Sequence, residues 1–163
     1  MREAIRALGH EATLVNYQTA RHVEAEQGHL RSLRPGALKG FVLNRLKSKP
    51  FAGPVSELSD HPFTTEAIDW QRFSSVVVGA DIVWNFTNRA FGTDPVFFGS
   101  HPSQKKTSFA AYAPSCGATP ADAPVPPHVS EGLRRFKAIQ VRDEATADLV
   151  FRVTSRRPQL VVD

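Results

Sequence analysis

The sequence predicts an α/β fold, a Rossmann-like parallel sheet with helices on both faces. Three observations lead to this prediction. Short apolar and β-branched runs alternate with stretches of helical periodicity along the chain. One of these runs, SSVVVG at residues 74–79, is continuously apolar, which is typical of a strand buried on both faces. With 163 residues, 41% hydrophobic and 22% charged, the chain has the size and composition of one globular domain.

The first half of the chain gives a helix, a strand and a long irregular stretch. Residues 2–8 have the pattern of a helix, and Gly9 is a signal for its C-terminal end. Residues 12–17 (ATLVNY) are expected to form a short strand. Pro50, Gly53 and Pro54 mark a loop, after which Thr64 or Thr65 can cap a short helix running to Trp70.

The second half predicts four strands with helical stretches between them. The strands are expected at residues 74–79, 107–113, 138–141 and 159–162. A loop rich in Pro and Ala covers residues 114–127, and helices are expected at residues 130–136 and 144–151. Asp143 is placed to cap the second of these helices. This alternation favours βαβ units and therefore a parallel sheet.

Both ends of the chain are abrupt for such a fold. A doubly wound half normally opens with a strand that leads into its first helix, whereas Met1 stands at the head of the predicted helix. We therefore expect residues 1–163 to be one incomplete domain that lacks its first strand. The alternative is a small domain that begins with a helix.

The positive charge of the chain is concentrated in one segment. Residues 28–50 contain six Lys and Arg and no Asp or Glu, which leaves 14 of the 20 basic residues against all 16 acidic ones elsewhere. Apolar residues recur in this segment at helical spacing, so we expect a basic helical insertion over residues 22–50. It is either a solvated surface helix or a contact for an anionic membrane surface or diphosphate. No nucleic-acid motif or interleaved aromatic residue accompanies the charge, so nucleic-acid binding is not expected.

Several classes of protein are excluded by simple counts. One cysteine, Cys116, rules out a disulfide framework and a multi-cysteine zinc site, and the six His show no metal-binding spacing. No G-x-G-x-x-G or Walker loop is present. Because no long apolar stretch or signal peptide occurs, we expect a cytoplasmic protein. Cys116 lacks the surroundings of a catalytic nucleophile, and a packed turn residue is the expected role.

Polar residues follow the predicted strands where each strand ends. If the strands are parallel, these residues meet at one edge of the sheet, the edge where open α/β sheets bind ligands. Asp81 could accept hydrogen bonds from a sugar or could cap a turn, and Trp84 could stack on a sugar or lie in the core. Arg142 could bind a carboxylate or phosphate or could tie a strand end to a neighbouring loop. The remaining candidates at this edge are Asn85, Ser115 and Gly117.

The order of these motifs resembles that of the polysaccharide pyruvyl transferase family. The resemblance is carried by ALGHE leading to VNY at residues 7–17, by FSSVVVGADIVWN at residues 73–85, and by KKTSFAAYAPSCG at residues 105–117. It continues in IQVRDEAT at residues 139–146 and closes with LVVD at residues 160–163. GADIVWN and VRDE are the specific blocks. Departures from the family pattern are Ala80 for Ser, Cys116 for an aromatic residue, and Thr146 for Ser.

The resemblance implies one half of a two-domain, glycosyltransferase-B-like enzyme. Such an enzyme transfers pyruvate from phosphoenolpyruvate to a sugar of a cell-surface polysaccharide, or of its lipid-linked precursor, as a ketal. It needs no cofactor beyond phosphoenolpyruvate as donor substrate. Most of the residues that bind phosphoenolpyruvate come from the second domain, which is absent from this chain, so this chain alone could be inactive. The residues expected to act are then Asp81 and Arg142 in catalysis, and Trp84, Asn85, Ser115 and Gly117 in binding the acceptor.

Other readings of the sequence stay open. A domain of a nucleotide-sugar glycosyltransferase of glycosyltransferase-B type would share the architecture, and a non-enzymatic α/β binding module is a third class. If the acceptor is linked to a lipid diphosphate, residues 28–50 are placed to contact the inner face of the membrane.

Overall fold

A computed structural model of the chain describes residues 1–15, 17, 68–88 and 94–162. The chain divides into two compact units, Met1–Ala67 and Ile68–Asp163, which are described separately below. The basic insertion expected over residues 22–50 lies outside the described residues, as does most of the helix expected from Thr64 or Thr65 to Trp70. Of that helix, residues 68 and 69 have no regular secondary structure and Trp70 begins a short 3-10 helix, so the helix is not formed over its described residues.

The first unit contains one described helix, α1 (Arg2–Ala7). It ends at Leu8 and is followed by Gly9 with φ +84°, so the predicted helix and its glycine stop are confirmed. Glu3 in the first turn and Arg6 in the last turn suit the helix dipole. Residues 11–15 have no regular secondary structure and Tyr17 is a single bridge residue. The strand predicted at residues 12–17 is therefore not formed over its described residues.

The second unit is built on a four-stranded sheet in which every described pairing is parallel. The strands are β1 (Ser75–Gly79), β2 (Ser108–Tyr112), β3 (Phe136–Val141) and β4 (Gln159–Leu160), and their order in the sheet is β1-β2-β3-β4. The register runs from Ser75 opposite Ser108 to Gly79 opposite Tyr112. The parallel α/β fold expected from the alternating pattern is thus present.

Helices connect the strands. The α-helices are α4 (Pro127–Arg135) and α5 (Glu144–Thr154), and short 3-10 helices are η1 (Trp70–Arg72), η2 (Pro95–Phe98) and η3 (Pro102–Gln104). Helix α4 begins three residues before the predicted start because Pro127, with its fixed φ, fits the first turn of a helix. Helix α5 ends at Ser155, which has a left-handed φ of +58°.

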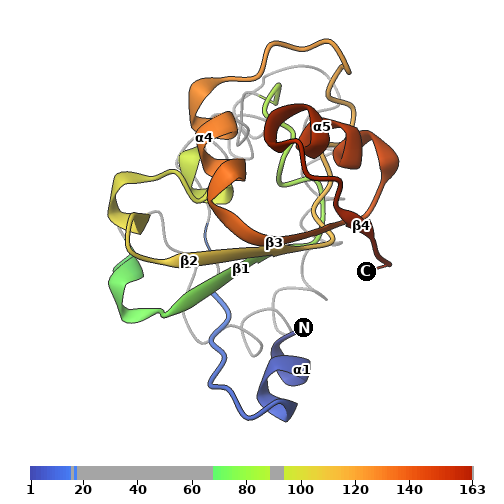
Figure 1. The fold of residues 1–163 in the computed structure, drawn as a ribbon. Coiled ribbons are helices and arrows are strands. Elements are labelled where there is room, and N and C mark those ends of the chain that lie inside the picture. Colours follow the sequence, from blue (N-terminus) through green and yellow to red (C-terminus); the bar gives the residue numbers. More distant parts are fainter. Residues whose placement is uncertain (16, 18–67, 89–93, 163) are drawn as a thin grey trace, which may run out of the picture. The chain divides into compact units, whose positions relative to one another are not determined.

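Both α4 and α5 lie on the same face of the sheet (Figure 1). Along β1 the burial alternates, with Val78 buried and Val77 39% exposed. The prediction that this strand is buried on both faces is therefore wrong. No helix of the described part of this unit covers the second face, so helices on both faces are not found there. One-sided burial explains why the strands tolerate Ser75, Ser108 and Lys137.

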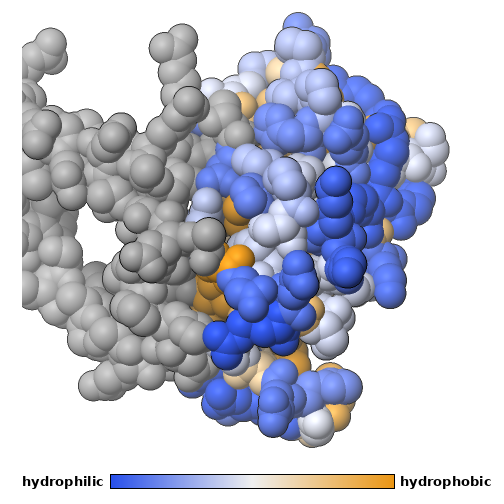
Figure 2. Space-filling model, turned by 90° about the vertical axis from the view of Figure 1, so that its left-hand side faces the viewer, coloured by the Kyte–Doolittle hydropathy of each residue, from blue (hydrophilic) through white to orange (hydrophobic). Residues whose placement is uncertain are grey.

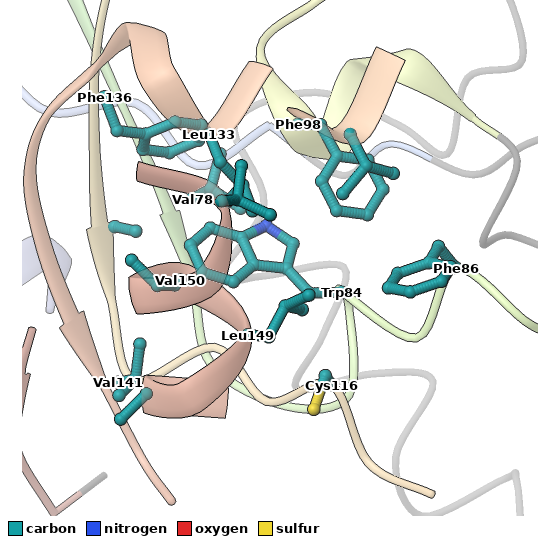
Figure 3. Close-up of a cluster of buried hydrophobic side chains, with 14 of the residues drawn as sticks. Val78, Trp84, Phe86, Phe98, Cys116, Leu133, Phe136, Val141, Leu149 and Val150 are labelled. Atoms are coloured by element: carbon teal, nitrogen blue, oxygen red, sulfur yellow. The ribbon is translucent and has the colours of Figure 1, made fainter. Parts of the chain in front are cut away.

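The core lies between the sheet and its two helices. Helix α4 contributes Val129, Gly132 and Leu133, at the i, i+3, i+4 spacing of one helical face. Phe109 and Phe136 come from neighbouring strands, with ring centroids 5.6 Å apart. Figure 3 shows Trp84 in the middle of this cluster, near Val78, Leu133 and Phe98. Gly132 allows α4 to approach η2 closely, since a Cβ at this position would lie 2.8 Å from the Cβ of Phe98.

The end of the sheet where β2 and β3 begin carries many polar side chains. Arg135 ties α4 to the preceding loops by donating to the carbonyl oxygens of Gly99, Gln104 (2.8 Å) and Lys105 (3.1 Å). Figure 2 faces this side of the molecule and shows that its described surface is mostly hydrophilic.

Among the described helices, none has the length and apolar character needed to cross a bilayer.

Candidate functional site

The candidate site is the edge of the sheet where the strands end, here called the carboxyl rim (residues 80–85, 113–117 and 142–143). At this rim the backbone of three non-glycine residues is left-handed: Ala80 (φ +47°), Asp81 (φ +64°) and Ala113 (φ +54°). Ala80 and Ala113 follow the paired ends of β1 and β2, so the two strands turn away at the same level. A left-handed conformation costs a residue with a side chain roughly 1–2 kcal/mol. Strain of this kind concentrates at functional sites.

Asp81 and Arg142 meet across the rim. Asp81 follows β1 and Arg142 follows β3, and their side chains form an ion pair of 3.8 Å between Nη2 and Oδ1. The sequence predicted both residues at this edge. The structure brings them together as an ion pair that connects the end of one strand to a neighbouring loop, which is one of the two roles expected for Arg142. Because the Asp81 side chain is 82% exposed, the pair contributes at most about 1 kcal/mol. A pair this weak leaves both groups able to exchange partners with a ligand.

Trp84 does not face the rim. Its side chain has no exposed surface. Its indole stacks on Phe98 with ring centroids 6.3 Å apart and forms a T-shaped pair with Phe136 with ring centroids 5.5 Å apart. The indole Nε1 donates to the carbonyl oxygen of Phe97 at 2.9 Å. The prediction that Trp84 stacks on a sugar is therefore corrected: its ring faces are occupied by the core, and it anchors the loop from inside (Figure 3).

Asn85 is a partly buried residue of the rim. Its Oδ1 accepts hydrogen bonds from the hydroxyl groups of Thr87 at 2.7 Å and Thr119 at 3.1 Å. The hydroxyl of Thr119 also contacts the carbonyl oxygen of Cys116 at 2.7 Å. Asn85 is thus held at the rim by groups from the two loops that follow β1 and β2, and Thr119 is a member of the site that the sequence did not suggest.

Ser115 and Gly117 lie in the turn after β2, but neither presents a side chain to solvent. Ser115 is buried, and its Oγ accepts from the N–H of Gly117 at 2.9 Å. Gly117 has φ +55° and lies against Ile82, so a side chain there would be strained and would clash. Both residues, which were predicted to bind the acceptor, instead stabilise the turn that forms part of the rim.

Cys116 is a packed turn residue, as the sequence predicted. Its side chain is 2% exposed, and burial raises the pKa of its thiol. A buried, protonated thiol is a poor nucleophile, which agrees with the absence of a catalytic motif.

A further carboxylate of the rim belongs to Asp143. Its Oδ1 accepts from the N–H of Thr146 at 2.8 Å and from the hydroxyl of Thr146 at 2.7 Å, which confirms it as the N-cap of α5. Partial burial would raise the pKa of this carboxyl, but hydrogen bonds from Ser115 and Thr146 and the charge of Arg142 outweigh it and lower the pKa. Thr146 was not predicted as a site residue, because its hydroxyl accepts from the N–H of Cys116 in a turn 30 residues away, which the local sequence does not reveal.

Chemically, the carboxyl rim offers one exposed carboxylate, one half-exposed guanidinium and an amide. Such a set can orient sugar hydroxyl groups and hold a phosphate or carboxylate. Among the described residues, no cluster of three or more His, Cys, Asp or Glu side chains could hold a metal ion.

In comparisons with protein-family models, curated proteins and solved structures, the chain matches none.

Proposed function

We propose that this chain is the acceptor-side domain of a polysaccharide pyruvyl transferase. The enzyme would join the pyruvyl unit of phosphoenolpyruvate to two hydroxyl groups of a sugar as a ketal, on a cell-surface polysaccharide or its lipid-linked precursor. Its fold would be one Rossmann-like half of a glycosyltransferase-B-like pair. A cytoplasmic enzyme fits a phosphoenolpyruvate donor, and membrane contact through residues 28–50 belongs to the same proposal.

The observation that carries the proposal is the Asp81–Arg142 pair at the carboxyl rim. GADIVWN and VRDE, the two sequence blocks that most specifically resemble the family, each contribute one member of the pair. The two groups are of opposite charge, 3.8 Å apart, and exposed enough to meet a ligand. This supports a site that handles hydroxyl groups and an anion together.

The chemistry assigns a different task to each group. In ketal formation two sugar oxygens bond to C2 of the enolpyruvyl group, the C2–O bond to phosphate breaks, and C3 gains a proton. The two sugar hydroxyl groups release two protons. One of them accounts for the proton gained at C3, and the other leaves with the phosphate. Asp81 would orient or deprotonate a hydroxyl group. Arg142 would stabilise the departing phosphate.

The test is phosphate release from phosphoenolpyruvate by the full-length protein, with candidate lipid-linked sugars as acceptors and mass spectrometry of the product. We expect Asp81→Asn and Arg142→Gln each to lower kcat/KM roughly 100-fold or more. Matched controls are Asp122→Asn and Arg134→Gln, which change exposed residues of the same types away from the rim.

Two results would contradict the proposal. Ketal formation that is undiminished in both rim variants would remove the roles given to Asp81 and Arg142. Release of a nucleoside diphosphate from a nucleotide sugar, with no phosphate released from phosphoenolpyruvate, would instead identify a glycosyltransferase.

A further inference from the structure

The turn after β2 is the part of the carboxyl rim to which the other parts are bonded. The N–H of Ser115 donates to the carbonyl oxygen of Asp81 at 2.9 Å, and the carbonyl oxygen of Ser115 accepts from the N–H of Trp84 at 3.1 Å. On the other side, the N–H of Arg142 donates to the carbonyl oxygen of Pro114 at 3.3 Å. The backbone positions of Asp81 and Arg142 therefore depend on where this turn lies.

The turn is held in place by the first turn of α5. The N–H of Cys116 donates to Oγ1 of Thr146 at 2.8 Å, and that hydroxyl donates to Oδ1 of Asp143 at 2.7 Å. The N–H of Gly117 donates to Oγ of Ser115 at 2.9 Å within the same turn, and the Ser115 side chain also helps to lower the pKa of the Asp143 carboxyl. The N–H of Cys116 is thus linked through the hydroxyl of Thr146 to the carboxylate of Asp143.

This arrangement goes beyond what a helix cap needs. A cap requires only that the carboxylate accept the backbone N–H of Thr146, which it does at 2.8 Å. The Thr146 side chain has no exposed surface and Ser115 is 4% exposed, so neither hydroxyl can turn to water for a substitute. A buried polar group that loses its partner costs about 1–3 kcal/mol, so removing one hydroxyl should loosen the turn.

We propose that Asp143 and Thr146 are positioning residues that hold the turn after β2, and through it Asp81 and Arg142, in the geometry that receives the ligand. The importance of that geometry for catalysis rests on the proposed function. The holding of the turn itself does not, because it concerns only contacts within the chain.

The chain contains its own reporter of this turn. Cys116 is the single cysteine of the sequence and is buried in the turn, so a thiol reagent can reach it only when the turn opens or the protein unfolds. Its labelling rate under native conditions therefore measures opening of the turn, without any knowledge of the substrate.

The experiment compares three variants of the full-length protein by labelling with a disulfide thiol reagent, measured at the Cys116 peptide by mass spectrometry, and by urea unfolding. Thr146→Val keeps the branched shape and removes the hydroxyl, and Thr146→Ser restores the hydroxyl. Thr154→Val is the matched control, because its hydroxyl bonds to the carbonyl oxygen of Val150 at 2.7 Å in the last turn of the same helix. We expect Thr146→Val to speed labelling of Cys116 about tenfold beyond the effect of its global stability loss. Thr146→Ser should label within about twofold of the parent, and Thr154→Val should follow its global stability alone.

The outcome separates positioning from general stability. Labelling of Thr146→Val that follows global stability just as Thr154→Val does would overturn the proposal, as would a failure of Thr146→Ser to restore protection. In the phosphate-release assay, Thr146→Val should lower kcat more than it raises KM for phosphoenolpyruvate, and Thr146→Ser should recover the loss. If no acceptor supports phosphate release, the proposed function fails, while the labelling result still decides the positioning role.

Discussion

Replacing Trp84 by Phe tests whether this side chain serves the core or a ligand. The change removes the indole N–H that donates to the carbonyl oxygen of Phe97 at 2.9 Å, which costs about 1 kcal/mol. It also removes ring volume from a site with no exposed surface, between Phe98 and Phe136, which costs at least ~1 kcal/mol more. We expect a total loss of about 2–3 kcal/mol in the free energy of unfolding.

The assay is urea unfolding followed by circular dichroism, with stability compared at an unchanged m-value. Phe151→Leu is the matched control, because Phe151 is an aromatic residue of α5 that is 50% exposed, and its loss should cost less than about 0.5 kcal/mol. If Trp84→Phe were equally mild and instead weakened binding of a sugar, the placement of Trp84 in the core would be refuted and its stacking role restored.

Two further changes probe the packing of α4 and the charge behind the rim. Gly132→Ala should destabilise the protein by about 1–3 kcal/mol, because the new Cβ would overlap the backbone of Phe98. Thermal unfolding measures this loss, and Arg134→Ala, which changes an exposed residue of the same helix, is the control. For Asp143 the pKa in the folded protein is lowered, so the stability it contributes is present above its ordinary pKa and is lost as the pH falls through the folded value. The stability gap between the parent and Asp143→Asn should therefore stay constant from about pH 7 to pH 5 and narrow below about pH 4. Asp122→Asn is the control, and a gap that widens in acid would contradict the assignment.

The sequence predicted the regular elements of the second unit well, because their signals are local. The strands near residues 74–79 and 107–113 are found within one residue of the predicted bounds. The cap at Asp143 was predicted and is confirmed, since an N-cap depends on a residue and the turn that follows it. Parallel pairing was also predicted, from the alternation of strands and helices, whereas the order of the strands in the sheet was not predicted.

The errors concern which way a side chain faces. A continuous apolar run such as that of β1 has no period, so it does not reveal that Val77 is exposed while Val78 is buried. Trp84 lies in a loop, where no periodicity exists, and its burial depends on Phe98 and Phe136, which come from distant parts of the chain. Only the tertiary structure decides such cases.

The same limit applies to the candidate site. Asp81 and Arg142 were placed at one edge by counting strands, and the ion pair between them agrees with that count. Ser115 was predicted to bind the acceptor, yet it is buried and its Oγ accepts a hydrogen bond from the N–H of Gly117. A polar residue at a strand end has the same signature in sequence whether it serves a substrate or the turn that supports one.

The order of the strands in the sheet is also their order along the chain. Of the four described strands, each from β2 onward therefore docks against a neighbour that has already been synthesised, and none of these four must wait for a later segment to be inserted beside it. Domains form from the amino-terminal end during synthesis, and pairings close in sequence involve the smallest loss of chain entropy. The sheet of residues 75–160 can accordingly grow by addition at one edge as the chain leaves the ribosome, with α4 and α5 covering the same face in turn. The carboxyl rim would then be completed only when β3 and the start of α5 have emerged.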